Sequence, residues 1–381
     1  MSPFTVGLVV NPVAGLGGAV GLKGSDGAEV QREALSRGAT PQAANRAAHA
    51  VRTLLSRHPA TRIVTVPGAM GEHSAQASGA VFDLVGLPAS PVTTPADTRA
   101  AVIALKDVDL LLFAGGDGTA RDVLDAVRGL GVGAPPVLGV PAGVKVYSGC
   151  FALSPAAAGF AAADYAASPR RAEAEVVDLD EERYRHGRVS PRLYGVLAVP
   201  ADRARLSGRK TGSSSAAPAT VEGIAGEVVA RMRPGVRYVL GPGATTTAVG
   251  RELDLVTTLL GVDVVEYQEG RSRLVASDVT EAELFALVNG HEAVAVLSVI
   301  GGQGFVLGRG NQQLSPRVLR AVQNLVVLAT QQKLAALNGR PLLADTGEED
   351  LDHKLAGHVQ VITGYRESTV YRIAAASEEN L

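Results

Sequence analysis

The residues best suited to chemistry stand at 115–119, where the sequence reads Gly-Gly-Asp-Gly-Thr. The apolar run before them, 110–114, is typical of a buried parallel strand, and 120–128 carries apolar side chains at helical spacing. A strand, a glycine turn and a helix N-terminus together direct backbone N–H groups at an anion, and glycine lets a phosphate come close. The sequence therefore predicts a phosphate-binding turn over 115–119.

Asp117 is the unusual member of this turn, because its negative charge repels a phosphate. A carboxylate in such a turn needs another role, either as a general base toward a hydroxyl group or as a partner of Mg²⁺. The alternative is an ordinary strand-to-helix turn with a solvated aspartate, and a lone Gly-Gly-Asp would favour it. The five-residue match between an apolar strand and a helix favours the functional interpretation.

Two further turns follow apolar strands and are candidate phosphate loops. Residues 5–10 predict a first buried strand, and 11–18 continue as Asn-Pro-Val-Ala-Gly-Leu-Gly-Gly, a turn signal followed by permissive glycines. Residues 136–140 predict another strand, and 141–149 then offer proline, glycine and Lys145. The lysine is a point charge suited to phosphate, although a solvated lysine at a helix start is the alternative.

The stretch 301–316 leaves a strongly apolar strand, 293–300, and carries five glycines with several amides and Arg309. Amides suit neutral edges such as an adenine, a ribose or a carboxamide, and arginine suits a phosphate. We expect this stretch to fold back onto the edge formed by 115–119 and to supply part of the acceptor site. An interdomain or subunit contact is the alternative.

Several of these motifs resemble those of a known superfamily of kinases. Residues 115–119 are similar to the signature shared by NAD kinases, diacylglycerol and sphingosine kinases and, in related form, phosphofructokinases. The turn at 11–18 resembles the Asn-Pro-x-x-Gly turn of the same superfamily. The sequences of 139–145 and 301–316 are similar to those of a divergent branch of the ATP-NAD kinase family, often called acetoin-catabolism protein X-like. The resemblance therefore covers nearly the whole chain.

The resemblance implies a kinase that transfers a phosphate from ATP or polyphosphate to the adenosine 2′-hydroxyl of NAD, with Mg²⁺ carried by the donor. Asp117 would accept the proton of the attacking hydroxyl. The implied binding residues are Asn11, Gly15, Gly17, Gly18, Gly115, Gly116, Gly118, Thr119, Pro141, Gly143, Lys145, Gly302, Arg309 and Asn311. Open alternatives are a kinase for another hydroxyl acceptor, a lipid or a nucleoside, and a non-catalytic nucleotide-binding accessory protein.

One departure from the family concerns the acceptor. Ordinary NAD kinases carry an Asn-Glu or Asn-Asp pair that holds the adenosine ribose, whereas here 193–196 read Leu-Tyr-Gly-Val at roughly that place. Ordinary members also have an antiparallel, β-rich second domain, and the second half of this chain instead alternates strands and helices. Both departures concern the identity of the substrate more than the phosphoryl chemistry.

Composition limits the class of protein. The chain has 381 residues and a formal net charge of −2, which argues against a nucleic-acid surface. Cys150 is the lone cysteine, which excludes an intramolecular disulfide framework and fits a reducing, cytoplasmic compartment. Residues 1–10 have no basic leader, and no apolar run approaches the roughly 20 residues of a membrane span. The sequence predicts a homo-oligomer with neither nucleic-acid nor membrane partners.

The elements that must position these residues alternate along the chain. Strands predicted at 5–10, 63–66, 110–114 and 136–140 are separated by helices, two of which begin at Thr40-Pro41 and Thr94-Pro95, each an N-cap followed by proline. This alternation predicts a doubly wound parallel sheet, with ligands beyond the carboxyl ends of its strands. We expect an α/β phosphate-binding domain over 1–150 and an α/β or α+β substrate domain over 151–381.

Overall fold

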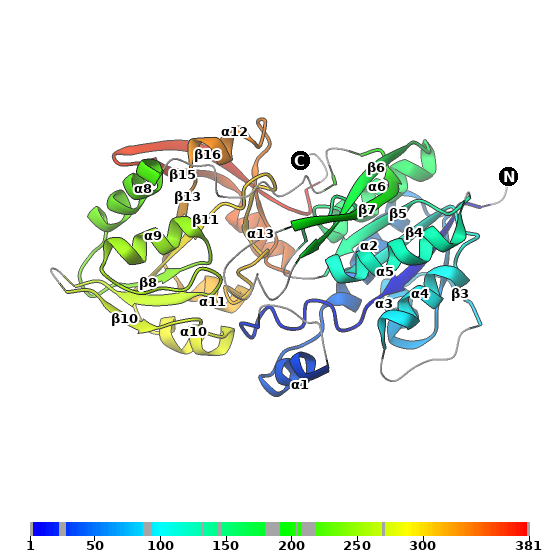
Figure 1. The fold of residues 1–381 in the computed structure, drawn as a ribbon, viewed down its shortest axis with the longest axis horizontal. Coiled ribbons are helices and arrows are strands. Elements are labelled where there is room, and N and C mark those ends of the chain that lie inside the picture. Colours follow the sequence, from blue (N-terminus) through cyan, green and yellow to red (C-terminus); the bar gives the residue numbers. More distant parts are fainter. Residues whose placement is uncertain are drawn as a thin grey trace.

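The computed structural model describes two parts, each built on a β-sheet and lying side by side (Figure 1). The N-terminal part holds the first sheet and the C-terminal part holds the second. The residues that the structure describes are 3–22, 28–86, 93–131, 133–142, 146–179, 191–202, 205–206, 218–268 and 271–378.

The first sheet has five strands, and all of its neighbouring pairs are parallel. Their order across the sheet is β3 (Phe82–Leu84), β2 (Arg62–Thr65), β1 (Thr5–Val10), β4 (Leu110–Gly115) and β5 (Val137–Pro141). The chain winds outward in one direction from β1 and in the other from β4, so the topological switch point lies between these two strands. Every residue of β4 is buried, because helices cover the sheet on both faces. The predicted doubly wound sheet is confirmed.

Helices flank this sheet in two packed groups: α2 packs against α3 and α6, and α4 packs against α5. A further helix, α1, closes a small apolar cluster with the loop that follows β1. The helical elements of this part are α1 (Ala28–Ser36), α2 (Ala43–Arg57), the 3₁₀ turn Gly68–Met70, α3 (Glu72–Ser78), α4 (Pro95–Ala104), α5 (Asp117–Leu130) and α6 (Pro155–Ala167).

A two-stranded antiparallel hairpin, β6 (Arg171–Leu179) and β7 (Pro191–Pro200), packs on α5 of the N-terminal part. The hydrophobic core of that part includes side chains from α6 and from both hairpin strands, and it continues as far as Leu206. Helix α6 and both hairpin strands thus contribute to this core, and the domain division expected at residue 150 stays a prediction.

The second sheet has nine strands and is mixed. Its order is β10 (Arg273–Ala276), β9 (Asp263–Glu266), β8 (Arg237–Leu240), β11 (Ala293–Ser298), β13 (Asn324–Leu328), β15 (Gly357–Gly364), β16 (Glu367–Ala375), β14 (Leu342–Ala344) and β12 (Phe305–Leu307). Strands β8, β11, β13 and β15 run parallel, whereas β8–β9, β9–β10 and β15–β16 are antiparallel. The expected second α/β or α+β domain is confirmed.

The helices of the C-terminal part are short and connect these strands. They are α8 (Pro218–Ala230), α9 (Ala244–Glu252), α10 (Glu281–Val288), α11 (Pro316–Ala321), α12 (Gln331–Ala335) and α13 (Glu349–Leu355). Phe305, Leu343, Ala374 and Ala376 of this part join the core of the N-terminal part, so the two parts share apolar packing. Within the described residues, no helix is long and apolar enough to cross a lipid bilayer.

Candidate functional site

The 115–119 turn joins β4 to α5 at the switch point. A Cβ on Gly115 would lie 2.4 Å from the Cβ of Thr119, so only glycine allows the chain to turn this closely. Gly116 is the N-cap residue of α5 and no side chain caps the helix, which leaves its first N–H groups without an intrahelical acceptor. Asp117, Gly118 and Thr119 form the first helical turn, three residues earlier than the helix predicted from 120. The helix N-terminus therefore supplies the partial positive charge that an anion requires.

Asn11 connects the two loops that meet at the switch point. Its Nδ2 donates to Thr119 Oγ1 at 3.0 Å, and its backbone N–H donates to the carbonyl of Ala114 at 2.9 Å. Its Oδ1 accepts the N–H of Val13 at 3.2 Å. The structure thus brings Asn11 and Thr119, which are 108 residues apart in sequence, to the same edge of the sheet.

The glycines of the loop after β1 lie in a succession of tight turns. The N–H of Gly18 donates to the carbonyl of Gly15, and the carbonyl of Gly17 accepts the N–H of Leu22. Gly17 and Gly18 are buried, and Gly15 has a positive φ of 75°. The same loop reaches the C-terminal part, where the N–H of Glu281 donates to the carbonyl of Ala19. Phosphate binding by these three glycines stays a prediction.

The carboxylate of Asp117 accepts three hydrogen bonds from the segment that follows β5. Oδ1 accepts the N–H of Ser148 at 2.9 Å and its hydroxyl at 2.6 Å, and Oδ2 accepts the N–H of Tyr147 at 2.8 Å. Burial raises the pKa of Asp117 above its ordinary value, while these hydrogen bonds and the nearby Arg309 guanidinium act in the opposite direction. The residue as a whole is half-buried, and the three hydrogen bonds give its carboxylate a defined orientation.

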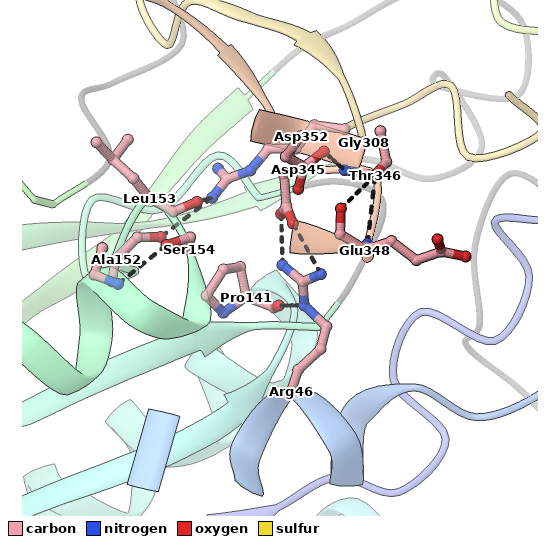
Figure 2. A network of polar contacts seen from close by, with 12 residues as sticks. Arg46, Pro141, Ala152, Leu153, Ser154, Gly308, Asp345, Thr346, Glu348 and Asp352 are labelled. Carbon is pink, nitrogen blue, oxygen red and sulfur yellow. Dashed lines mark hydrogen bonds and ion pairs between the residues drawn. The ribbon is translucent and has the colours of Figure 1, made fainter. Parts of the chain in front are cut away.

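Pro141 ends β5 opposite Gly115, and its carbonyl accepts a hydrogen bond from Arg46 of α2 at 2.5 Å. The same guanidinium binds Asp345 of the C-terminal part through two bonds, Nη2 to Oδ2 at 2.6 Å and Nη1 to Oδ1 at 3.3 Å. Figure 2 shows this bridge between Arg46, Pro141 and Asp345. Gly143 and Lys145 of the predicted loop lie outside the described residues.

A second group of polar contacts extends from this bridge. Asp352 Oδ1 accepts the N–H of Thr346 at 2.8 Å, as Figure 2 shows, and burial raises the pKa of Asp352 to about 6. One turn beyond Arg46 on α2, His49 Nε2 lies 3.0 Å from Glu349 Oε1, and burial lowers the pKa of His49. The junction between the two parts is therefore built from charged as well as apolar groups.

The 301–316 stretch reaches the segment that holds Asp117, but its polar groups contact the protein itself. The Nε2 of Gln303 donates to the carbonyl of Val146 at 2.8 Å. Arg309 donates to the carbonyls of Ala152 and Leu153 at 3.1 and 2.8 Å. Arg309 is 5% exposed, and burial lowers its pKa to about 10. A contact between Arg309 and a phosphate stays a prediction.

The amide of Asn311 closes a turn of its own loop: Nδ2 donates to the carbonyl of Val306 at 2.7 Å, and Oδ1 accepts the N–H of Gly308 at 3.0 Å. The carbonyl of Gly302 accepts a hydrogen bond from Arg340. These contacts organise the loop, and binding of a ligand by Asn311 or Gly302 stays a prediction.

Sequence reasoning did not single out Arg46, Asp345 or Ser148. Arg46 is one arginine in an alanine-rich helix, and its partner Asp345 lies 299 residues away. Ser148 stands in the predicted loop 141–149, but no motif distinguishes it from other loop serines. Cys150 is fully buried, and burial raises the pKa of its thiol, so it has the properties of a packing residue.

Whether Mg²⁺ can bind near the 115–119 turn depends on the oxygen ligands available at that edge of the first sheet. The described residues contain no group of three or more histidine, cysteine, aspartate or glutamate side chains placed to hold a metal ion. Asp117 is the carboxylate at the turn, and three of its lone pairs already accept hydrogen bonds. Mg²⁺ commonly binds through one or two carboxylates and the phosphates of a substrate. Binding of Mg²⁺ together with a phosphorylated donor stays a prediction.

Comparison with known families assigns the chain to a class. The ATP-NAD kinase N-terminal domain matches residues 6–168, and the ATP-NAD kinase C-terminal domain matches residues 233–373. The chain therefore belongs to the ATP-NAD kinase family. Membership supports a kinase with nucleotide substrates, in agreement with the resemblance seen at 115–119.

Solved structures offer a more distant likeness. Three of them are of a diacylglycerol kinase from Bacillus anthracis str. Sterne, named as putative in two cases, at 16% identity and TM-scores of 0.24–0.25. Each match covers 47% of this chain, which spans about half the length of the matched structures. The comparison with curated proteins found no match.

Proposed function

We propose that this chain transfers the terminal phosphate of ATP or polyphosphate to the adenosine 2′-hydroxyl of NAD and so forms NADP. The observation that supports the proposal best is the position of Asp117 in the uncapped first turn of α5, at the switch point of the first sheet. Ligands of doubly wound sheets bind at this point. The matches to both ATP-NAD kinase domains favour NAD as the acceptor.

Phosphoryl transfer depends mainly on positioning and on neutralising charge. In the proposed reaction, backbone N–H groups of Gly118 and Thr119 bind the transferring phosphate at the positive end of α5. Mg²⁺, carried by the donor, offsets the negative charge of the phosphates. Asp117 accepts the proton of the 2′-hydroxyl while the new O–P bond forms and the bond to the donor's leaving oxygen breaks. The leaving group is ADP or a polyphosphate shortened by one unit.

A purified sample of the full chain tests this proposal. The protein is incubated with Mg²⁺, with ATP or polyphosphate, and with NAD, a nucleoside or a lipid as acceptor, and the product mass is measured. NADP formed only when NAD and a donor are both present is the expected result. A phosphorylated nucleoside or lipid without NADP would replace NAD as the acceptor, and the absence of any phosphorylated product would reject a kinase of this kind.

Asp117→Asn provides the matched control in that assay. Its amide keeps one oxygen for the two bonds from Ser148 but presents an NH₂ group to the N–H of Tyr147. The variant should still fold, because it loses about one hydrogen bond, and it should lose turnover because no base remains.

The single cysteine favours a cytoplasmic location, and size-exclusion chromatography tests the expected homo-oligomer.

A further inference from the structure

Ser148 is fully buried, and its hydroxyl contacts two groups of fixed character. The N–H of Val177, in the hairpin strand β6, donates to Ser148 Oγ at 3.0 Å. Because a hydroxyl has one hydrogen, that hydrogen is left for Asp117 Oδ1, 2.6 Å away. A proton on Oδ1 would reverse this bond and leave the buried serine hydrogen without a partner. The arrangement therefore selects a carboxylate that accepts at Oδ1.

The two oxygens of Asp117 are not equivalent under this accounting. A carboxylate oxygen offers about two lone pairs, and both lone pairs of Oδ1 are used by the N–H and the hydroxyl of Ser148. Among the described residues, only the N–H of Tyr147 donates a hydrogen bond to Oδ2. One lone pair of Oδ2 therefore remains to accept a proton from a bound substrate. The hydrogen bonds thus distinguish the oxygen that anchors the side chain from the oxygen that can react.

The donors themselves are held by the C-terminal part. Gln303, which is 3% exposed, fixes the carbonyl of Val146 immediately before Tyr147. The Tyr147 side chain packs against Val177 and Leu260, the latter from the loop before β9. The N–H groups that bind Asp117 are therefore oriented by contacts from both parts of the molecule.

We propose that Ser148 is a positioning residue for Asp117: it anchors Oδ1, leaves Oδ2 as the reacting oxygen, and depends on Gln303 to hold its segment in place. This inference rests on the proposed role of Asp117 as the base for the acceptor hydroxyl. Besides these hydrogen bonds, the charge of the Arg309 guanidinium lowers the pKa of Asp117, and the charge of Asp117 adds to the effect of burial in raising the pKa of the Cys150 thiol. Both residues are kept in the variants below, and Gln303→Ala also removes the 3.5 Å contact between Gln303 Oε1 and Arg309 Nη1.

Ser148→Ala is the first test, because it removes a hydrogen bond that favours the charged form of Asp117. Such a bond is worth enough to move the pKa of Asp117 upward by about one unit or more. The acid limb of the kcat/KM profile, which reports the base of the free enzyme, should move up by the same amount. The plateau kcat should fall about ten- to a hundred-fold through lost positioning, with little change in the KM of the nucleotide donor.

Ser154→Ala is the matched control. Ser154 is also buried, and its Oγ accepts the N–H of Ala157 as the cap of α6 rather than donating to Asp117. Its loss should lower the thermal unfolding midpoint and leave the pH profile unchanged. Gln303→Ala, which touches neither oxygen of Asp117, should move the acid limb in the same direction as Ser148→Ala by a smaller amount. It serves as the second variant should Ser148→Ala fail to fold.

An infrared pH titration separates this inference from the proposed function. The band of the protonated Asp117 carboxyl is identified by its disappearance in Asp117→Asn, and its midpoint is compared between the natural chain and Ser148→Ala. An upward shift supports the positioning role even if NAD is not the acceptor. An unchanged midpoint in both the Ser148 and Gln303 variants would overturn it, whatever the activity. A loss of kcat with an unchanged midpoint would reduce Ser148 to a packing residue.

Discussion

The ion pair between Arg46 and Asp345 joins the two parts of the molecule, and we expect it to stabilise their junction measurably. The perturbation is a double-mutant cycle of Arg46→Met and Asp345→Asn, in which each change removes a charge and keeps most of the side-chain volume. The pair has two hydrogen bonds, and its side chains are 20% and 10% exposed. It therefore lies between a surface pair and a fully buried one.

The magnitude follows from that intermediate burial. Exposed pairs contribute about 0–1 kcal/mol, and removing one partner of a buried pair costs about 3–5 kcal/mol. Arg46→Met also leaves the carbonyl of Pro141 without this donor. We expect each single variant to lower the free energy of unfolding by about 2–3 kcal/mol. The coupling energy of the cycle should be about 1–2 kcal/mol, within the range observed for residues in contact.

Denaturant unfolding followed by circular dichroism measures the four corners of the cycle, and limited proteolysis reports whether the junction opens. The control is the same cycle at Arg62 and Asp83, a 2.6 Å pair whose side chains are both more than half exposed. Its coupling energy should stay below about 1 kcal/mol and vanish at high salt. A coupling energy below about 0.5 kcal/mol at Arg46 and Asp345, the limit for independent sites, would refute the reasoning.

Three further predictions concern single residues. Asp117→Asn should reduce turnover by about 10²–10⁴-fold, measured by steady-state kinetics, with a thermal unfolding midpoint close to that of the natural chain. The pKa of Asp352 in the folded chain, about 6, lies above its ordinary value of 3.8, so between these values the folded chain binds more protons than the unfolded chain. The free energy of unfolding should therefore fall as the pH rises from about 4 to 6. Asp352→Asn should flatten that dependence when unfolding is measured across this range. Gly308 has a φ of 94°, and a Cβ there would lie 1.8 Å from the carbonyl oxygen of Asp345, so Gly308→Ala should cost more than about 2 kcal/mol of stability by the same denaturant assay.

The parts of the fold that sequence reasoning predicted are those that local patterns define. The buried strands β1 and β4 stand out because a parallel strand covered on both faces is a continuous apolar run. The turn after β4 stands out because a strand, glycines and a helix start occur in succession. The order of strands in the first sheet then follows from the rules that govern alternating strands and helices.

Helix starts show where local rules reach their limit. Thr94-Pro95 does begin α4, with the reciprocal hydrogen bonds of a capping box to Asp97. Thr40-Pro41 carries the same signal, yet α2 begins at Ala43 with no side-chain cap. Residue 43 is an alanine, so the reciprocal acidic partner present at Asp97 is missing, and the prediction at Thr40 is wrong.

Strands β3, β10, β12, β14 and β16 were not predicted, and for all of them except β10 the length or the exposure of the strand explains why. β3, β12 and β14 have three residues each, too few for a periodic pattern to develop. In β16 the residues before Ile373 are exposed or half-buried and mostly polar, and only its end, Ile373 to Ala375, is buried. It joins the sheet by pairing with β15 and β14, and single-sequence patterns hold no information on such partners.

The assembly of the candidate site depends on contacts of the same long-range kind. Asp117 belongs to the first sheet, yet its three described hydrogen bonds come from residues about 30 positions later. That segment is held in turn by Gln303 and Arg309, more than 150 residues further on. For Gln303 and Arg309 these contacts agree with the interdomain contact that was the alternative expectation for the 301–316 stretch. Gln303 and Arg309 stabilise the segment that orients the carboxylate, and in this way the C-terminal part shapes the site without placing a described hydrogen-bonding group on Asp117 itself.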